Sequence, residues 1–415
     1  MLDDLRPYIY KTPDGGRTWT DISGNLPAKA YVWVVREDPR NPNLLYAGTE
    51  LGLYASYSGG NWIPLHLKNL PTVAVHDITV HPRENDLILA THGRGFWIFD
   101  DATALQQINA QVLASGAHLF EPRPALRFTT RFTRYGIGNK VFTGSNPPYG
   151  AVITYYLKDA PGEKTAVKLQ ILASDGKLIR ELAAIPKEAG LNRATWDLRH
   201  EPPRLRQPPR DEEVEFGGGP RGPQVSPGTY TVRLVAGDTA REQRLTVRLD
   251  PTITIPAADL QAQFDHALKL RDMHSAVTDA QLAIENIKQQ LQQLERTIRE
   301  RLPEAPKELT QAVAEHLKQA ESLEGLLARP PEAPRYRMGP RLVEQVSQFA
   351  ASVNGVNAAP TPAQRAYFAE LQTEFRKTMG EVNAWIERAL PRLNETLARH
   401  QVPTLLIGKP IDLPR

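Results

Sequence analysis

The stretch VVREDPRNPNLLYAGTELGLY at residues 34–54 recurs as ITVHPRENDLILATHGRGFW at residues 78–97. The matched residues lie 43 positions apart, and the pairs are Pro39/Pro82, Arg40/Arg83, Leu44/Leu87, Ala47/Ala90, Gly52/Gly95 and Tyr54/Trp97. An earlier partial copy, YIYKTPDGG at 8–16, matches GLYASYSGG at 52–60 with a shift of 44. Repeats of about 40–50 residues built from short β-rich runs and turns are typical of β-propeller blades.

Within one repeat the alternation of apolar residues predicts strands at Tyr31–Arg36, Leu44–Thr49 and Gly52–Ser56. Residues 1–105 then hold about two and a half blades, whereas closed propellers have roughly four to eight. We expect the other blades upstream of Met1, in another chain, or nowhere. A partial arc would leave strand edges and apolar faces uncovered at Tyr8–Tyr10, Val32–Val35 and Leu44–Tyr46, which favours self-association through these residues.

The turn at residues 12–19 fits the pattern S/T-x-D-x-G-x-x-W, known as the Asp-box, at Thr12, Asp14, Gly16 and Trp19. The carboxylate can accept hydrogen bonds from turn amides, and glycine permits a positive φ. We expect the tryptophan to pack beneath the hairpin. These roles are structural rather than catalytic. A second copy, SYSGGNW at 56–62, lacks the aspartate, and IFDDATAL at 98–105 has no such box.

Three histidines, His76, His81 and His92, fall in one repeat and invite a metal hypothesis. Their spacing puts His81 and His92 in turns on opposite sides of a strand, with no carboxylate at ligand spacing, so no metal and no other cofactor is expected. The weak candidates for an acid/base pair are Asp77, Asp100 and Asp101. Neither a G-x-S-x-G, an HExxH nor a phosphate-binding loop occurs. The sequence therefore predicts no complete catalytic site.

Residues 150–252 change to alternating strands, with the hairpin signal Asp175-Gly176, and predict a β-sandwich. Residues 106–149 are expected to be a linker. The stretch 201–223 is rich in proline, glycine and charge and is expected to be a mobile loop of the sandwich.

Residues 256–400 follow helical spacing and predict an antiparallel bundle, and 401–415 are left as a C-terminal tail. The first helix carries a heptad face at Leu270, Met273, Val277, Ala280, Ile284, Ile287, Leu291, Leu294 and Ile298. Pro303 and Pro306 end it, and further helices are expected at Lys307–Arg329, Arg341–Val353 and Pro362–Leu397. A coiled-coil dimer is the alternative interpretation, although partner helices follow directly.

Composition restricts the function further. The chain has 50 Lys and Arg against 47 Asp and Glu, which argues against a nucleic-acid partner. No cysteine is present, which excludes disulfides and thiolate sites. No apolar run is long enough to span a membrane, and MLDDLRPYIY is unlike a signal peptide.

Several stretches together resemble the C-terminal part of bacterial sortilin-like, Asp-box repeat β-propeller proteins, often labelled glycosyl hydrolase. They are NPNLLYAGTELGLYASYSGGNW, VHDITVHPRENDLILATHGRGFWIFDD, NPPYGAVITYYL, GLNRATWDLR, PGTYTVRL and ADLQAQFDHALKLRD. The sandwich resembles the Ig-like domain of flagellar hook-capping proteins. The resemblance implies a β-plus-α multidomain chain: a partial propeller, an Ig-like sandwich and a helical bundle. It also implies an extracytoplasmic location, in the periplasm or secreted.

Two functions remain open. The first is a non-catalytic module that binds a protein or polysaccharide ligand, and the second is an accessory part of a glycoside hydrolase whose catalytic blades lie outside this chain. Family members carry a signal peptide and many more blades, and this sequence lacks both. The absence of a visible carboxylate pair favours the binding module.

Overall fold

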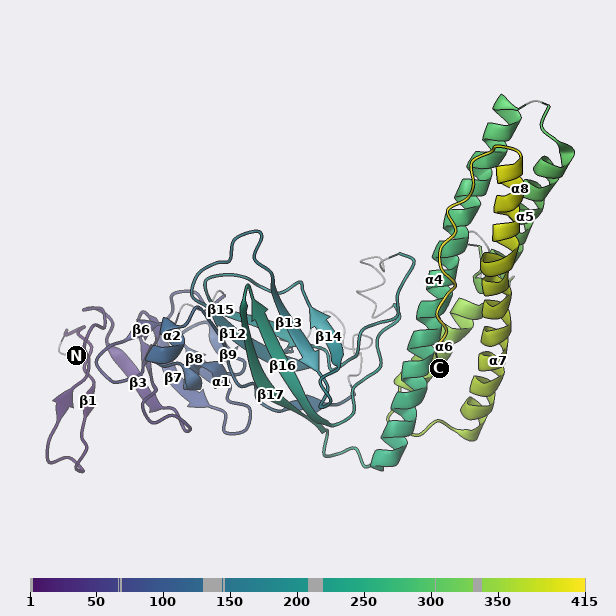
Figure 1. Cartoon of the computed structure of the whole chain (residues 1–415). Coiled ribbons are helices and arrows are strands. Elements are labelled where there is room, and N and C mark those ends of the chain that lie inside the picture. The colour runs from purple at the N-terminus through teal and green to yellow at the C-terminus, as the bar shows by residue number, and fades with distance from the viewer. Residues whose placement is uncertain are drawn as a thin grey trace. The chain divides into compact units, whose positions relative to one another are not determined.

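The computed structural model describes residues 3–65, 67, 69–129, 144, 146–207, 219–302, 304–330 and 338–414. Parts of the expected linker and loop, together with Pro303, lie outside these residues. The chain forms two compact units. One comprises Met1–Asp197 with Pro227–Leu249, and the other comprises Leu198–Ser226 with Asp250–Arg415. The fold is therefore mixed, with several β-sheets followed by C-terminal helices (Figure 1).

The strands of the first unit begin with three small sheets. Their bounds are β1 Tyr10–Lys11, β2 Thr20–Asp21, β3 Val32–Glu37, β4 Leu45–Thr49, β5 Gly52–Ser56, β6 Ile63–Pro64, β7 Val75–Val80, β8 Leu87–Thr91 and β9 Gly95–Phe99. The sheet orders are β1-β2, β3-β4-β5-β6 and β7-β8-β9, all antiparallel. The three strands predicted for the second copy of the repeat appear within one residue at each end.

The repeat places its matched apolar residues in one core. Leu44 and Leu87 are fully buried, as are Tyr46 and Leu89. Ile9 and Val34 are also buried, so the expected exposure of Leu44–Tyr46 and Val32–Val35 is largely wrong. These side chains are covered because β7 packs against β3 and β4.

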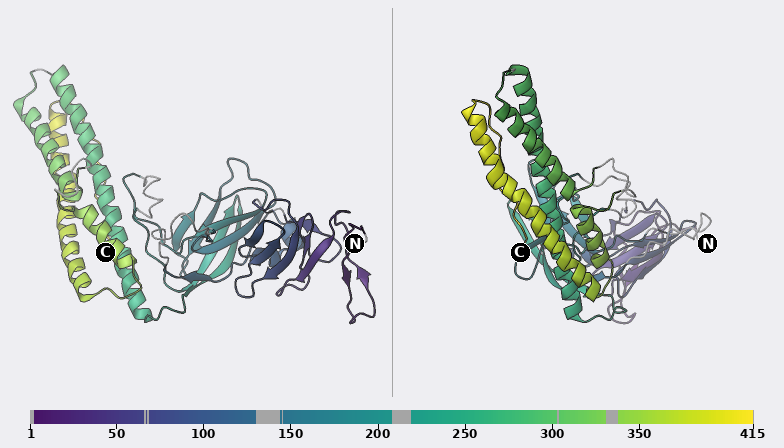
Figure 2. Two further views of the ribbon diagram at one scale, coloured as in Figure 1. Left: turned by 180° about the vertical axis from the view of Figure 1, so that it is seen from behind. Right: turned by 90° about the vertical axis from the view of Figure 1, so that its right-hand side faces the viewer.

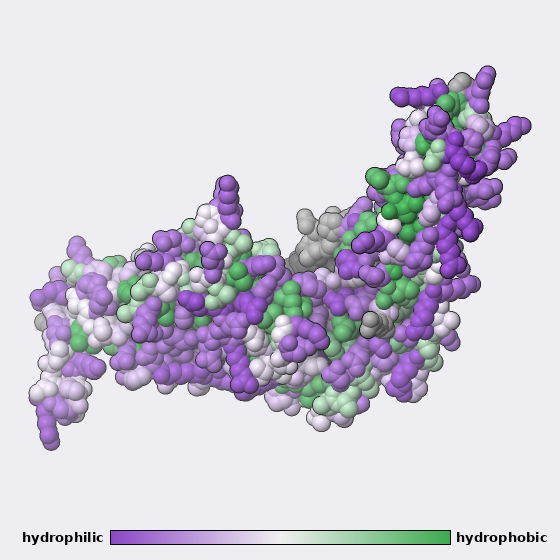
Figure 3. Space-filling view, viewed as in Figure 1, coloured by the Kyte–Doolittle hydropathy of each residue, from purple (hydrophilic) through white to green (hydrophobic). Residues whose placement is uncertain are grey.

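The expected exposure at Tyr8–Tyr10 is correct for its two tyrosines, and β9 also exposes apolar side chains. Tyr8 and Tyr10 are about half exposed near the N-terminus. On β9, which pairs only with β8 among the described strands, Phe96 and Ile98 are 79% and 59% exposed. On the face drawn in Figure 3, apolar side chains occur as separate patches among hydrophilic ones.

Two tryptophans of the repeat have opposite environments. Trp19 follows the Asp-box turn and is 60% exposed, so its predicted packing beneath the hairpin is wrong. Trp62, from the copy without the aspartate, is 2% exposed and donates from Nε1 to the carbonyl of Ile22 at 2.8 Å. The side-chain amide of Asn25 also bonds both backbone groups of Trp62, at 2.6 and 2.9 Å. Trp62 therefore holds residues near 22–26 against the β3–β6 sheet.

The remaining strands of this unit form two sheets. Their bounds are β10 Ala117–Leu119, β11 Ala125–Arg127, β12 Ala151–Leu157, β13 Val167–Leu172, β14 Leu178–Leu182, β15 Gly190–Trp196, β16 Gly228–Ala236 and β17 Thr239–Leu249. One sheet has the order β10-β12-β15 and the other β11-β17-β16-β13-β14. Trp196 of the first meets Tyr230 of the second edge to face, with ring centroids 5.6 Å apart.

The predicted linker at 106–149 is structured over much of its described length. It contains helix α2 (Ala110–Ala114) and the end of α1 (Thr103–Gln107), and it supplies β10 and β11 to the two sheets. Strand β11 pairs with β17 in parallel, which joins segments more than a hundred residues apart. Short strands separated by polar turns carry little periodicity, and this is why the sequence reads as a linker.

The second unit is helical. Its elements are α4 Ala257–Arg301, α5 Lys307–Leu327, α6 Leu342–Asn354, α7 Pro362–Ala384, the π-helical turn η1 Trp385–Ala389 and α8 Leu390–Arg399. The described residues of the stretch 201–223, expected within the sandwich, group with these helices instead. Arg204 and Arg206 pair with Asp279 and Glu285 of α4. In the part of the chain that the structure describes, no helix is long and apolar enough to cross a bilayer.

The predicted heptad face of α4 is buried against the other helices, so intrachain packing covers it without a second chain. Figure 2 shows α7, η1 and α8 as one continuous rod. The π turn precedes Pro391, which lacks an N–H and would clash with the carbonyl of Glu387 in a regular helix. In this turn Trp385 is buried and donates to His316 Nδ1 at 3.0 Å.

The C-terminal tail lies along the helices as an extended segment without regular secondary structure. Val402 and Leu405 are buried. Side-chain amides hold its backbone in pairs of hydrogen bonds: Asn394 bonds Leu405, Gln290 bonds Leu406 and Asn383 bonds Ile411, all at 2.8–3.2 Å. The tail is therefore part of the helical unit.

Candidate functional site

The candidate carboxylate Asp77 lies exposed on β7. Its Oδ1 atom is 2.6 Å from Nη2 of Arg36 on β3, and both side chains are about half exposed. An ion pair of this exposure contributes little to stability. The same Oδ1 atom also accepts from the backbone amide of Ile78 at 2.9 Å.

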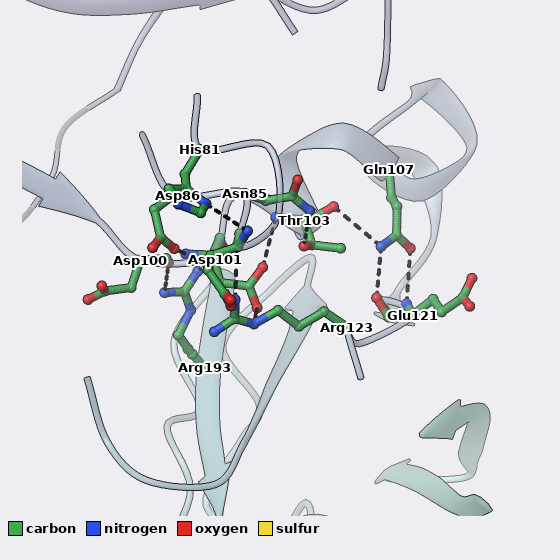
Figure 4. A network of polar contacts seen from close by, with 11 residues as sticks. His81, Asn85, Asp86, Asp100, Asp101, Thr103, Gln107, Glu121, Arg123 and Arg193 are labelled. Carbon is green, nitrogen blue, oxygen red and sulfur yellow. Dashed lines mark hydrogen bonds and ion pairs between the residues drawn. The ribbon is translucent and has the colours of Figure 1, made fainter. Parts of the chain in front are cut away.

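Asp100 and Asp101 belong to a polar network at the other end of the β7–β9 sheet (Figure 4). Arg193 of β15 donates to the backbone carbonyls of Asp100 and Asp101 at 2.7 and 2.8 Å. The buried carboxylate of Asp101 accepts from the Thr103 amide at 3.1 Å. Asp86 accepts from the Asp101 amide at 2.8 Å. These contacts of Asp101 and of the Asp100 backbone fix the turn after β9, whereas the Asp100 side chain points away from the network (Figure 4).

The same network extends to the segment after β10. Nε of Arg123 lies 3.4 Å from the Asp101 carboxylate, and Arg123 also bonds Glu84. The Gln107 side chain bonds both backbone groups of Glu121 at 2.9 Å (Figure 4). Burial raises the pKa of Asp100, and the charge of Asp86 raises it further. Asp101 and the backbone of Asp100 therefore connect the β7–β9 sheet to Arg193 of the β10-β12-β15 sheet.

Strand register separates Asp77 from Asp100 by a distance too long for a glycosidase pair. Asp77 pairs with Ala90, which pairs with Phe96, and Asp100 lies four residues beyond Phe96. Four extended residues span about 13 Å. The two carboxylates of a glycosidase are roughly 5–9.5 Å apart.

The structure brings two of the three histidines together. The rings of His76 and His92 lie 5.0 Å apart. His81 has a different neighbour: its Nδ1 atom accepts a hydrogen bond from the backbone amide of Glu84. Within the described ranges, no group of three His, Asp or Glu side chains could hold a metal ion.

His76 and His92 continue a row of rings on the surface of the first unit. Tyr31 and Trp33 are 5.2 Å apart, and Trp33 and His76 are 4.1 Å apart. We call Tyr31, Trp33, His76 and His92 the aromatic row. Trp33 is 46% exposed, so the row is accessible from solvent.

Two β-bulges build the aromatic row. The β3–β4 register shifts between Val32 and Val34, which leaves Trp33 unpaired. The β7–β8 register shifts between Val75 and Asp77, which leaves His76 unpaired. A bulge redirects a side chain and often lies beside a functional site. Because Trp33 and His76 are 43 positions apart, the repeat places the same irregularity twice, side by side.

Glu50 adds a carboxylate to the aromatic row. Its Oε2 atom accepts from Trp33 Nε1 at 3.0 Å. The hydrogen bonds from Trp33 and then Tyr31 lower the pKa of Glu50, and the nearby His76 and His92 act in the same direction. The site thus presents aromatic rings and an ionised acceptor on one surface.

Sequence reasoning named His76 and His92 but missed Tyr31, Trp33 and Glu50. The 43-residue equivalence of Trp33 and His76 was the available signal. The bulges were not visible because a bulge changes pairing without changing composition.

The Asp-box residues form a closed turn. Asp14 Oδ1 accepts from the amides of Arg17 and Thr18 at 3.0 and 2.9 Å, and Thr12 Oγ1 accepts from the Gly16 amide at 2.7 Å. Gly16 has a φ of +96°. The carboxylate is occupied by its own turn, which fits a structural role.

Comparison of the chain with protein-family models gives no match, and comparison with curated proteins gives none either.

Proposed function

We propose that this protein is a non-catalytic binding module whose aromatic row contacts a polysaccharide. The observation that carries the proposal is the pair of bulges that set Trp33 beside His76. Pyranose rings have apolar C–H faces that pack on aromatic rings, and their hydroxyl groups donate to carboxylates such as Glu50. A protein ligand with an aromatic or hydroxyl-rich loop is the second kind of partner that this surface fits.

The architecture that we infer is that of the sortilin-like, Asp-box repeat proteins. The 43-residue repeat and the β3–β6 and β7–β9 sheets support the interpretation as propeller blades. The β10-β12-β15 and β11-β17-β16-β13-β14 sheets, whose Trp196 and Tyr230 rings meet edge to face, support an Ig-like sandwich. An extracytoplasmic location follows from this resemblance. The exposed edge of β9, with Phe96 and Ile98, is where further blades or a second copy would pair.

Trp33→Ala is expected to weaken polysaccharide binding by about tenfold, because an aromatic contact of about 1.4 kcal/mol is lost. The measurement is a screen of the full chain on immobilised glycans, followed by titration calorimetry with the best ligand. Trp19→Ala is the matched control, since Trp19 is also exposed but lies outside the aromatic row. Unchanged affinity in Trp33→Ala, or an equal loss in Trp19→Ala, would contradict the proposal.

The accessory part of a glycoside hydrolase is the alternative function. We expect its carboxylates to come from outside this chain, since Asp77 and Asp100 are about 13 Å apart along the strand direction alone. We therefore expect the pure protein to release no reducing sugar from β-glucans and no sialic acid from sialosides. A β-glucanase in parallel reactions shows that the assay detects turnover. Turnover that Asp77→Ala or Asp100→Ala abolishes would establish the enzyme instead.

A further inference from the structure

The helical unit contains a cavity of about 530 Å³ between α4, α6 and the stretch that includes Arg199 and Arg221. Ion pairs hold this stretch on the helix: Arg204 to Asp279 and Arg206 to Glu285. The Arg204 amide also donates to Ser275 Oγ at 3.1 Å. This stretch, which forms one wall of the cavity, is therefore held on α4 by both charged and neutral groups.

The described lining of the cavity is positively charged. Arg199, Arg221 and Arg271 contribute guanidinium groups, and none of the described lining residues is acidic. Nε of Arg271 lies 2.6 Å from Asp272, and Nη1 donates to the Glu201 carbonyl at 3.2 Å. Arg199 donates to the Gly222 carbonyl at 2.9 Å. These bonds orient planar groups that bind carboxylate or phosphate in a fork.

His274 supplies a second and independent sign of a ligand. It lines the cavity, is only 5% exposed, and its Nδ1 atom has no hydrogen-bond partner among the residues that the structure describes. Buried side-chain nitrogens are nearly always paired. Burial lowers the pKa of His274, against an opposing hydrogen bond with the backbone of Arg204. A neutral imidazole leaves Nδ1 free to accept from, or donate to, a bound molecule.

The opposite wall is polar but uncharged. Ser347 and Asn354 of α6 line it together with the C-terminal end of that helix. Helix C-termini carry partial negative charge and disfavour an anion. Hydroxyl groups suit this side, because they can donate to carbonyls and accept from the asparagine amide.

We propose that this cavity binds a small hydroxylated organic anion, such as an acidic sugar. Its carboxylate or phosphate group lies against Arg199, Arg221 and Arg271, and one of its polar groups pairs with His274. Its hydroxyl groups face Ser347 and Asn354. A hexose-sized molecule fits the volume.

The test is titration calorimetry of the full chain with four probes: glucuronate, glucose 6-phosphate, glucose and inorganic phosphate. We expect at least one acidic sugar to bind, glucose to bind at least tenfold more weakly, and inorganic phosphate to bind more weakly than glucose 6-phosphate. The two acidic probes distinguish a carboxylate from a phosphate ligand. Equal binding of glucose, or no binding of either acidic sugar at millimolar concentration, would overturn the proposal. If inorganic phosphate bound as tightly as glucose 6-phosphate, the proposal that the ligand carries hydroxyl groups would be wrong.

Two variants link the binding to this cavity. Arg271→Gln should lower the affinity for the acidic sugar about tenfold. Arg296→Gln is the matched control, since Arg296 is an exposed arginine on the same helix and is not among the described lining residues. If a variant fails to fold, binding is followed instead by NMR of the unmodified protein, through the ¹⁵N chemical shift of His274 Nδ1. A shift on adding ligand is expected, and its absence at saturation would refute the site.

Discussion

Replacing Trp62 by alanine is expected to destabilise the β3–β6 sheet by about 3–5 kcal/mol, the cost of removing a buried tryptophan. The side chain is 2% exposed and packs in a cluster with Ile9, Leu26 and Ala47. Its loss opens a cavity and leaves the Ile22 carbonyl without its indole donor. Residues near 22–26 should then detach from the sheet.

Hydrogen exchange of the full chain measures this effect. Peptides covering β4 and β5 should exchange about a hundredfold faster or more in Trp62→Ala. Trp19→Ala should change exchange little, because Trp19 is 60% exposed and keeps only a hydrogen bond to the Gly16 carbonyl at 3.1 Å. If Trp19→Ala had the larger effect, the Asp-box tryptophan would be the anchor and the assignment of Trp62 would be wrong.

Leu291→Ala is expected to destabilise the helical unit by about 3–5 kcal/mol. Leu291 is fully buried on the heptad face of α4, in the core shared with α5, α6 and α7. Leu282 on the same helix is 44% exposed. Leu282→Ala makes the same chemical change at the surface and should alter the unfolding free energy by no more than about 0.5 kcal/mol.

Urea unfolding followed by circular dichroism at 222 nm tests this pair, since nearly all helix lies in the second unit. The midpoint for Leu291→Ala should fall well below that of the unmodified protein, and the midpoint for Leu282→Ala should not. Similar losses in both variants would show that α4 buries both faces, as in a coiled-coil dimer. Sedimentation of the unmodified protein would then report the dimer directly.

The sequence by itself predicted the features that depend on local periodicity. The 43-residue repeat predicted β3, β4 and β5 closely, although the expected exposure of Leu44 was wrong because β7 packs against this sheet. The heptad spacing predicted which side of α4 is buried, from Leu270 to Ile298. Such patterns are readable because neighbouring residues on one face share one environment.

Only the tertiary structure decided which tryptophan is buried. Trp19 and Trp62 end similar turns, but Asn25 and Ile22 come to Trp62 from another part of the chain. The strands β10 and β11 within the predicted linker depend likewise on distant partners, β12 and β17. Burial and pairing of this kind follow from contacts between remote segments, which carry no local periodicity.

The same holds for the two sites. The aromatic row requires two bulges to turn Trp33 and His76 onto one surface, and a bulge leaves no mark in composition. The cavity in the helical unit requires Arg199 and Arg221 to lie over His274, although more than fifty residues separate them along the chain. The sequence determined the elements, and the packing of remote segments decided where their functional side chains meet.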